Sequence, residues 1–218
     1  MRKTTPKPPI DDRLLDTAIE QFGRQGLEGA STRAIAAAAQ TAMSSITYHY
    51  GGKEGLYLAA AQRIAEQIGL RFAAALEHAP DPETLAPQAA IEQILVLADS
   101  FLSMMLSPEA AHWARFIVRE QMEPTEAFDV LWGQFMGRVA GRLVKLVQRA
   151  GNGRWKTAEA RVRAVALIGQ VLVFRVARAT VMRVTGWDEI GTAQAGDIRR
   201  VLQAHIRAIL NSTEVNAS

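Results

Sequence analysis

The sequence has no cysteine among its 218 residues, which excludes disulfide bonds and cysteine-ligated metal sites. It also lacks a long hydrophobic run. The longest strongly apolar stretch without a charged residue, residues 164–174, is far shorter than the roughly 20 residues that cross a bilayer. The N-terminal stretch MRKTTPKPPIDD has no apolar segment of the kind found in secretory signals. These absences predict a soluble, cytoplasmic protein with no membrane partner.

Residue patterns typical of catalytic sites are absent as well. The histidines at positions 49, 78, 112 and 205 lie far apart and do not have the spacing of a metal site. There is no G-x-S-x-G elbow, phosphate loop or G-x-G-x-x-G motif, and Gly151-Asn152-Gly153 is typical of a loop between helices. We therefore expect no catalytic residues, no metal, no cofactor and no enzyme activity. An all-helical enzyme with an unrecognised site is the remaining alternative.

The overall charge is nearly balanced. A net charge of +3 and an isoelectric point near 9.5 are too mild to identify nucleic acid as a partner. The distribution is more informative, because Arg2, Lys3 and Lys7 lie within residues 1–9, which contain no acidic residue. We expect this segment to be a flexible basic arm that is either solvated or in contact with phosphates.

Helical periodicity is what the sequence does contain. Apolar residues recur at helical spacing nearly throughout, and no stretch alternates with a period of two. Glycines and prolines divide this pattern, which predicts an all-α fold of about nine helices. The expected helices cover residues 10–22, 32–39, 43–50, 53–78, 87–106, 108–122, 124–150, 157–185 and 194–211.

A proline-rich stretch, APDPETLAP at residues 79–87, is the strongest candidate for a domain boundary. The predicted organisation is a small helical domain over residues 1–52, a connecting helix over residues 53–78, and a larger helical domain over residues 79–218.

Residues 32–50 have the spacing of a helix-turn-helix motif, in which the second helix enters the DNA major groove. That second helix, MSSITYHY, mixes aromatic rings with hydroxyl groups, as expected if one face packs in the core and the other meets DNA. Ile46 and Tyr50 share the expected core face. The expected base contacts are Ser44, Ser45, Thr47, Tyr48 and His49. A helical protein can have this spacing by chance, so further residues are needed to decide.

Those residues extend from Leu14 to Ala59: LLDTAIEQFGRQGLEGASTRAIAAAAQTAMSSITYHYGGKEGLYLA. This segment resembles the N-terminal domain of the TetR family of bacterial transcriptional regulators. The resemblance rests on Ala18, Phe22, Gly26, Thr32, Ile35, Ala36, Ala39, Tyr48, Tyr50, Lys53, Glu54 and Leu56. It implies that Arg33 reaches the bases, and that Thr32 and Lys53 bind phosphate.

The chain departs from the family pattern in the turn. Gln40, Thr41 and Ala42 stand where the family has glycine, valine and serine. A left-handed conformation costs a non-glycine residue about 1 kcal/mol, and alanine offers no side-chain cap. Either Thr41 caps the second helix instead, or the turn has a different shape.

Two later segments, RFIVREQMEPTEAFDVLW (115–132) and ALIGQVLVFRVARATVMRVTGW (166–187), resemble the CecR-like subgroup. This resemblance implies a ligand-responsive repressor whose C-terminal helices form both the ligand pocket and the dimer interface. The residues agree with a dimer, because residues 162–176 are apolar on nearly every side and need burial. A second stripe comes from Ile198, Val201, Leu202, Ile206, Ile209 and Leu210. A monomer that encloses its central helix is the alternative.

Large, soft side chains and a few polar ones are candidates for ligand binding, although core packing is an equally good role for the apolar ones. Arg175 lies between two apolar residues and either pairs with an acid such as Glu120 or meets an acidic ligand. The candidates are Met104, Met105, Trp113, Phe116, Arg119, Trp132, Phe135, Met136, Gln170, Phe174, Arg175 and Arg178.

The sequence therefore predicts a ligand-responsive transcriptional regulator. In this hypothesis a homodimeric repressor binds a palindromic double-stranded DNA operator and is released by a small-molecule inducer. The alternative is an all-helical small-molecule sensor or carrier that does not bind DNA.

Overall fold

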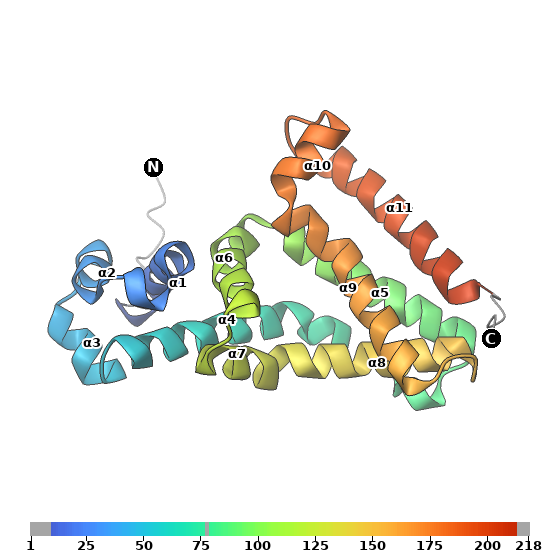
Figure 1. Ribbon diagram of the computed structural model, residues 1–218, viewed down its shortest axis with the longest axis horizontal. Coiled ribbons are helices and arrows are strands. Elements are labelled where there is room, and N and C mark those ends of the chain that lie inside the picture. The colour runs from blue at the N-terminus through green and yellow to red at the C-terminus, as the bar shows by residue number, and fades with distance from the viewer. Residues whose placement is uncertain (1–9, 77–78, 213–218) are drawn as a thin grey trace, which may run out of the picture. The chain divides into compact units, whose positions relative to one another are not determined.

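A computed structural model describes residues 10–76 and 79–212, and all regular structure within these ranges is helical (Figure 1). The predicted all-α fold is confirmed. The predicted basic arm at residues 1–9 lies outside the described residues. So do residues 77–78, at the end of the predicted connecting helix, and residues 213–218.

The chain divides into two compact units, each built from segments that are distant in sequence. Unit 1 comprises Met1–Gly69 and Ala111–Phe135, and unit 2 comprises Leu70–Ala110 and Met136–Ser218. This division follows packing. The division predicted from the sequence, at residues 52 and 78, follows proposed roles and stays a prediction.

Unit 1 contains the N-terminal helices, the first part of the long fourth helix, and the segment around α7. Its helices begin and end close to the expected glycine and proline positions. Gly26 has a left-handed φ of 74° and interrupts the first helix near its predicted end. The helices are α1 (Ile10–Gly29), α2 (Thr32–Ala38), α3 (Met43–Tyr50), α4 (Lys53–Leu76), α6 (Pro108–Met122) and α7 (Glu126–Leu131).

An aromatic cluster forms the centre of unit 1. The Tyr57 ring on α4 lies 4.8 Å from the Phe22 ring on α1 and 4.6 Å from the Phe116 ring on α6, measured between centroids. All three side chains are buried. Edge-to-face and stacked ring pairs of this kind add to the free energy gained from burial alone. The cluster therefore holds α4 against both α1 and α6.

A buried carboxylate lies beside this cluster. Glu120 on α6 is 1% exposed and is the one charged side chain that is buried within residues 12–73 and 79–212. It accepts a 2.6 Å hydrogen bond from the Tyr57 hydroxyl and a 3.1 Å hydrogen bond from the Thr125 amide. The Thr125 hydroxyl donates to it as well. Burial, followed by the hydrogen bond to Glu120, raises the pKa of Tyr57 above its usual range.

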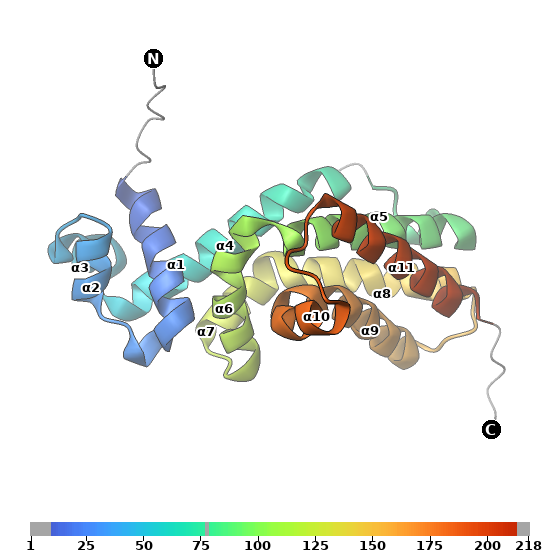
Figure 2. The ribbon, with the colours of Figure 1, turned by 90° about the horizontal axis from the view of Figure 1, so that it is seen from above.

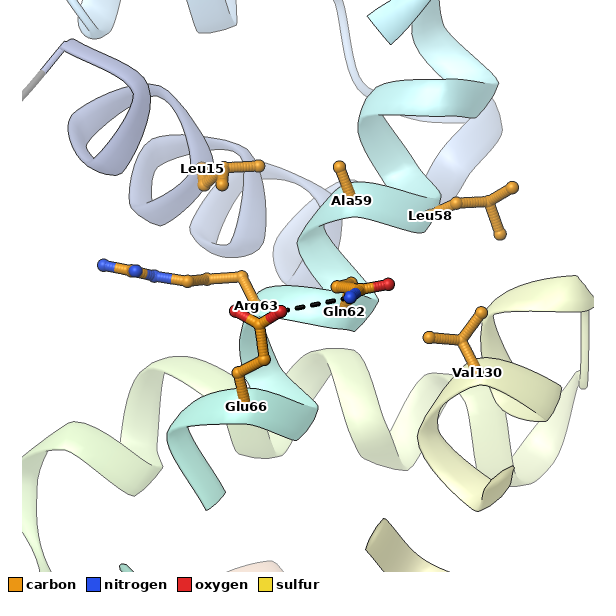
Figure 3. A pocket seen from close by; sticks show the side chains of 7 residues that line it. All are labelled: Leu15, Leu58, Ala59, Gln62, Arg63, Glu66 and Val130. Atoms are coloured by element: carbon orange, nitrogen blue, oxygen red, sulfur yellow. Dashed lines mark hydrogen bonds between the residues drawn. The ribbon is translucent and has the colours of Figure 1, made fainter. Parts of the chain in front are cut away.

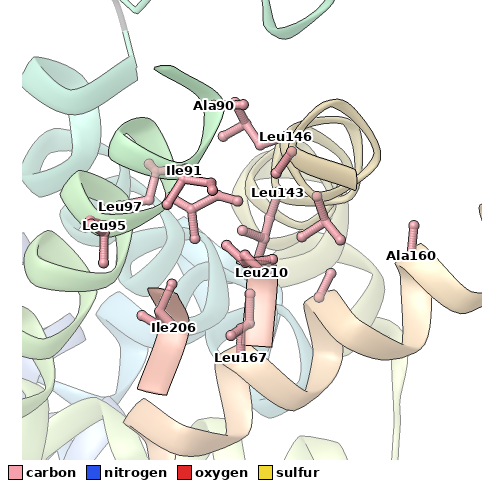
Figure 4. Close-up of a cluster of buried hydrophobic side chains, with 14 residues drawn as sticks. Ala90, Ile91, Leu95, Leu97, Leu143, Leu146, Ala160, Leu167, Ile206 and Leu210 are labelled. Carbon is pink, nitrogen blue, oxygen red and sulfur yellow. The ribbon is translucent and has the colours of Figure 1, made fainter. Parts of the chain in front are cut away.

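Unit 2 is a helical bundle (Figures 1 and 2), and buried side chains from four of its helices form a hydrophobic core cluster. Leu95 on α5, Leu146 on α8, Leu167 on α9 and Ile206 on α11 are among the buried side chains that form it (Figure 4). The recurrence of apolar residues at helical spacing in these segments predicted such a core. The helices are α5 (Pro87–Leu106), α8 (Gly137–Gly151), α9 (Thr157–Val176), α10 (Arg178–Thr185) and α11 (Thr192–Asn211).

Helix α5 is long and apolar enough in composition to cross a membrane. It contains Glu92 and Asp99, however, which form ion pairs with Arg207 and Arg199 of α11. Its apolar side chains Ile91, Ile94 and Leu95 are buried in the bundle. This pattern is typical of the core helix of a helical bundle.

The proline-rich stretch at residues 79–87 is held by basic side chains of α8. The Arg142 guanidinium donates to the Pro80 carbonyl oxygen at 2.8 Å, and the Lys145 ammonium pairs with Glu83 at 2.9 Å. Arg149 donates to the Leu85 carbonyl oxygen. The predicted linker therefore packs on the bundle of unit 2 and contains a short 3₁₀ helix, Pro82–Thr84.

Two expected helices are interrupted. The segment predicted as one helix over residues 124–150 consists of α7, a π-helical turn (Trp132–Met136) and α8. The segment predicted as one helix over residues 157–185 bends by 81° at the Ala177 junction between α9 and α10. No proline or glycine marks that bend, so nothing local in the sequence predicted it.

The apolar side chains of α9 lie on two faces, one buried and one exposed. Ala160, Ala164 and Leu167 face the core of unit 2, whereas Val162 and Val165 are 69% and 68% exposed. On α11, Ile198, Leu202, Ile206 and Leu210 are buried in the same chain, and Val201 is exposed. Most of the α11 stripe predicted for a dimer interface therefore packs inside the subunit. The exposed valines of this region are Val162, Val165, Val173 and Val176 on α9 and Val201 on α11.

Candidate DNA-binding interface

The turn between α2 and α3 has the shape of a helix-terminating Schellman motif. The Thr41 amide donates to the Ala36 carbonyl oxygen at 3.0 Å, and the Gln40 amide donates to that of Ala37 at 3.1 Å. Gln40 takes the left-handed conformation, with φ of 56°. The turn therefore keeps the left-handed geometry that glycine would favour, although this conformation is less favourable for the glutamine side chain.

The two short helices differ in their N-caps. The Ser31 hydroxyl accepts a hydrogen bond from the Ala34 amide and caps α2. Ala42 occupies the cap position of α3 without a side-chain hydrogen bond. The Thr41 hydroxyl instead donates to the Ser45 hydroxyl at 3.4 Å, so Thr41 orients a side chain of α3 and is not its N-cap residue.

Helix α3 has a buried face and an exposed face. Ile46 is fully buried and Tyr50 is half-buried, while Ala36 and Ala39 of α2 are buried as well. Ser44, Thr47, Tyr48 and His49 are exposed, and Ser45 is half-buried. Tyr48 is 83% exposed, which is unusual for a tyrosine that has no role at the surface. These four exposed side chains, with the half-buried Ser45, are the candidate base contacts of α3 named from the sequence.

The end of α3 depends on three glycines. Gly51 adopts a left-handed conformation with φ of 74°, and its amide donates to the Thr47 carbonyl oxygen at 3.0 Å. Gly52 also has a positive φ. At Gly55, in the first turn of α4, an added Cβ would lie 1.8 Å from the Tyr50 carbonyl oxygen. Only glycine fits at position 55 without a backbone shift.

Sequence reasoning missed the role of Gly55, and it considered Glu120 only as a possible partner of Arg175. A glycine in the first turn of a long helix lowers helix propensity, and this was the one available signal for a close backbone approach. Glu120 had no comparable signal, since burial of a single acid depends on the packing of α4, α6 and α7.

The predicted phosphate contacts lie at helix N-termini. Thr32 is the first residue of α2 and is half-buried, and Arg33 beside it is exposed. Lys53 is the first residue of α4, and its ammonium donates to the Glu28 carbonyl oxygen at 2.9 Å. An ammonium group has three donors, so this bond leaves two N–H groups for a phosphate.

The candidate ligand-binding residues of unit 1 have different surroundings. Trp113, Phe116 and Phe135 are buried, whereas Trp132 is exposed and stacks on Phe128. The Arg119 guanidinium packs beside Gly26 of α1, where an added Cβ would lie 3.0 Å from a terminal nitrogen. The three buried aromatic side chains belong to the interior of unit 1, and their role in ligand binding stays a prediction.

The candidates of unit 2 are buried or half-buried. Met104 and Met105 are buried at the end of α5, and Met136, Gln170, Phe174 and Arg178 are half-buried. Arg175 donates to the Met105 carbonyl oxygen and, at 2.6 Å, to the Ser107 carbonyl oxygen. Its cation thus meets the negative end of the α5 dipole, which differs from the ion pair with Glu120 considered from the sequence.

A shallow pocket of about 310 Å³ lies in unit 1 (Figure 3). It is lined by Leu15 of α1, by Leu58, Ala59, Gln62, Arg63 and Glu66 of α4, and by Val130 of α7, and by none of the predicted ligand-binding residues. Its polar side chains already have partners: Gln62 donates to Glu66 at 3.0 Å, and Arg63 pairs with Asp12 at 3.0 Å. Within the described ranges no group of three or more histidine, aspartate or glutamate side chains could hold a metal ion.

The chain matches two protein families over most of its length. Residues 14–60 match the tetR family of bacterial regulatory proteins, and residues 90–213 match the C-terminal domain of the HTH-type transcriptional dual regulator CecR. The CecR protein of Shigella flexneri is 32% identical over 209 residues, which are 91% of this chain and 90% of that protein. The regulatory protein RaaS of Mycobacterium tuberculosis is 33% identical over 158 residues, 72% of this chain and 66% of RaaS.

Solved structures of similar fold span nearly the whole chain. A TetR-like transcriptional regulator from Rhodococcus sp. RHA1 is 25% identical, with a TM-score of 0.57, over 96% of this chain and all of that one. AibR, solved in complex with isovaleryl coenzyme A and operator DNA, has a TM-score of 0.64 at 15% identity. That match covers 90% of this chain and 97% of AibR, and at this identity it concerns the fold alone.

Proposed function

The chain belongs to the TetR family of transcriptional regulators, with a CecR-type C-terminal domain, and from this premise we propose that it binds a palindromic DNA operator as a homodimer and is released by a small molecule. Repression is the proposed outcome of operator binding. The relatives are transcriptional regulators, and we propose neither a catalytic role nor a cofactor for this chain. We infer a cytoplasmic location from the same relatives.

The observation that carries the DNA-binding proposal is the exposed polar face of α3. A helix-turn-helix protein places this helix in the major groove, with its N-terminal residues at the base edges. Exposed hydroxyl and ring groups on that face would otherwise have no role, because Ile46 on the opposite face already provides the packing. The proposed base contacts are Arg33, Ser44, Ser45, Thr47, Tyr48 and His49, and the proposed phosphate contacts are Thr32 and Lys53.

The exposed valines of α9 and α11 support a dimer. Val162, Val165 and Val201 expose apolar surface that a monomer would leave in water, and burial returns roughly 25 cal/mol per Å². Helical faces of this kind are buried when a two-fold axis brings two copies together. We propose that α9 and α11 form the interface.

Ligand release would act through α4. This helix is continuous from Lys53 to Leu76 and contributes residues to both units. We propose that a small molecule bound among the candidate residues of the C-terminal domain tilts α4. A tilt would change the distance between the two recognition helices, which must lie about 34–36 Å or a multiple apart to enter successive major grooves. About 1–3 kcal/mol of differential binding is sufficient for such coupling.

Selection of duplexes from a random DNA pool tests the DNA-binding proposal directly. Enrichment of palindromic sequences, followed by gel-shift titration, is the expected result. Tyr48→Ala should weaken binding to the selected duplex more than binding to random DNA. A protein that enriches no sequence would favour the alternative of a sensor or carrier without DNA binding. Light scattering at micromolar concentration would reveal a monomer if the dimer proposal is wrong.

A further inference from the structure

Given the proposed function, on which this inference rests, we infer that α3 reads thymine methyl groups and that Met43 is a specificity-determining residue of the operator contact. The operator half-site would then present thymines to the first turn of α3. Met43 was not among the base contacts named from the sequence.

The first step is the chemistry that α3 lacks. Its sequence, MSSITYHY, has no arginine, lysine, asparagine, glutamine, aspartate or glutamate. Bidentate recognition of guanine needs arginine or lysine, bidentate recognition of adenine needs asparagine or glutamine, and cytosine is read by acids. Helix α3 can therefore offer only single hydrogen bonds and apolar contacts. In the major groove, the thymine methyl is the group that apolar side chains recognise.

The second step is the position of Met43. It is the first residue of α3, at the end of the helix that a helix-turn-helix protein directs at the bases. Its side chain is 50% exposed, although methionine is ordinarily a core residue. Ile46 and Tyr50 already provide the packing of α3, so the exposure of Met43 needs another explanation.

The third step is the partner of Met43 on the same face. Thr47 lies four residues on, and side chains at this spacing are neighbours on a helix surface. Thr47 is exposed and carries a methyl group of its own. Met43 and Thr47 thus form a small apolar patch beside the hydroxyls of Ser44 and Thr47. A patch of this size matches one or two thymine methyl groups.

The other polar groups of α3 are partly occupied within the chain. The Ser45 hydroxyl accepts from Thr41, and the rings of Tyr48 and His49 lie edge-to-face with centroids 4.9 Å apart. The ring contact leaves the Tyr48 hydroxyl and the His49 ring nitrogens available, so these groups together with Ser44 and Thr47 offer single hydrogen bonds, which discriminate poorly between bases. Specificity from α3 therefore depends chiefly on the methyl contacts, while Arg33 of α2 is the side chain suited to guanine.

Deoxyuridine provides the test, because it differs from thymidine only by the methyl group. A duplex selected from a random pool is prepared with single thymine-to-uracil replacements across one half-site, on both strands in turn. Binding is measured by fluorescence anisotropy for the wild-type protein, Met43→Ala and Met122→Ala. Met122 is 79% exposed on α6 and serves as a matched control.

We expect one or two replacements to weaken wild-type binding about fourfold each, which corresponds to roughly 0.8 kcal/mol for a buried methyl-sized group. Met43→Ala should weaken binding to the thymine duplex by a similar factor and should lose the response to uracil at one of those positions. Met122→Ala should behave as the wild type does in both respects.

Three outcomes would overturn the inference: selected half-sites without thymine, uracil replacement without effect, or an unchanged uracil response in Met43→Ala. Each of these leaves DNA binding intact and so leaves the proposed function standing. Failure of the pool to enrich any sequence would instead refute the proposed function and, with it, this inference. Circular dichroism of each variant establishes that a lost response does not come from unfolding.

Discussion

Helices α3 and α9 both expose side chains that the proposed function needs, but they do so in different ways. Helix α3 is short and exposes mainly hydroxyls and rings, with one buried residue, Ile46. Helix α9 extends from Thr157 to Val176 and exposes valines. The first surface would meet a polar, charged partner, and the second would meet a copy of itself.

The difference shows how position and area contribute to recognition. Few apolar contacts hold α3, so its position depends on backbone geometry at Gln40, Gly51 and Gly55. The face of α9 is supported along its whole length by Ala160, Ala164, Leu167 and Val171, which are buried in unit 2. We therefore expect α3 to be sensitive to small backbone shifts, and α9 to be sensitive chiefly to charge placed on its exposed face.

The largest effect is expected from a charge on the α9 face. Val165→Glu would place an unpaired carboxylate in the proposed dimer interface, at a cost of about 3–5 kcal/mol. Dimer dissociation should increase at least a hundredfold in sedimentation or light-scattering measurements, and operator affinity should fall with it. Val184→Glu, on the exposed surface of α10, is the control and should remain dimeric. A dimeric Val165→Glu protein would show that the interface lies elsewhere.

A methyl group at position 55 should have the next largest effect. Gly55→Ala would force the Tyr50 carbonyl away from the start of α4. Overpacking of this kind destabilises a protein by about 1–3 kcal/mol. Operator affinity should fall about tenfold, while helix content by circular dichroism stays unchanged. Gly69→Ala lies on the same helix with no atom within 4 Å of the added Cβ, and should bind as the wild type does. Equal affinities for the two variants would contradict the proposed dependence of α3 on backbone position.

Loss of the Tyr57 hydroxyl should lower stability and leave operator contacts in place. Tyr57→Phe keeps the ring contacts with Phe22 and Phe116 but removes a donor to the buried Glu120. The expected loss in the free energy of unfolding is about 1–3 kcal/mol. Urea denaturation should show this decrease in the free energy of unfolding. Tyr48→Phe, on the exposed face of α3, should leave stability unchanged.

The raised pKa of Tyr57 predicts that the free energy of unfolding depends on pH. The pKa of Tyr57 is raised in the folded state, so the folded protein holds this proton more tightly than the unfolded chain does. The stability that this proton contributes is fully present below the ordinary tyrosine pKa of 10.0, and it decreases as pH rises above that value. The free energy of unfolding should therefore fall more steeply above pH 10 in the wild type than in Tyr57→Phe. Parallel curves would argue against the Tyr57–Glu120 hydrogen bond.

The smallest effect is expected at the proposed phosphate contact. Lys53→Ala should weaken binding to all DNA sequences by a similar factor, and should reduce the slope of log affinity against log salt by about one unit. Lys156→Ala, exposed at the start of α9, provides the control and should leave the slope unchanged. A sequence-dependent loss in Lys53→Ala would mean that this lysine contacts bases.

The sequence alone determined the helical class and most helix ends. The bounds of α3, α5 and α6 coincide with those predicted from Gly51, Pro87 and Pro108. These residues act within one or two turns, through backbone conformation and missing amide donors, so their effect can be derived without knowledge of the fold. Helical spacing of apolar residues is local in the same sense, and it placed Ile46 in the core correctly.

Tertiary structure decided which apolar face of each helix is covered and which polar groups meet. Leu202 and Val201 are adjacent and similar in character, yet one is buried in the subunit and the other is exposed. The carbonyl partners of Arg175 and the Tyr57 donor to Glu120 are distant in the chain from the residues they meet. The reason is physical: periodicity shows that a face is apolar, but only the packing of the other helices determines what covers it.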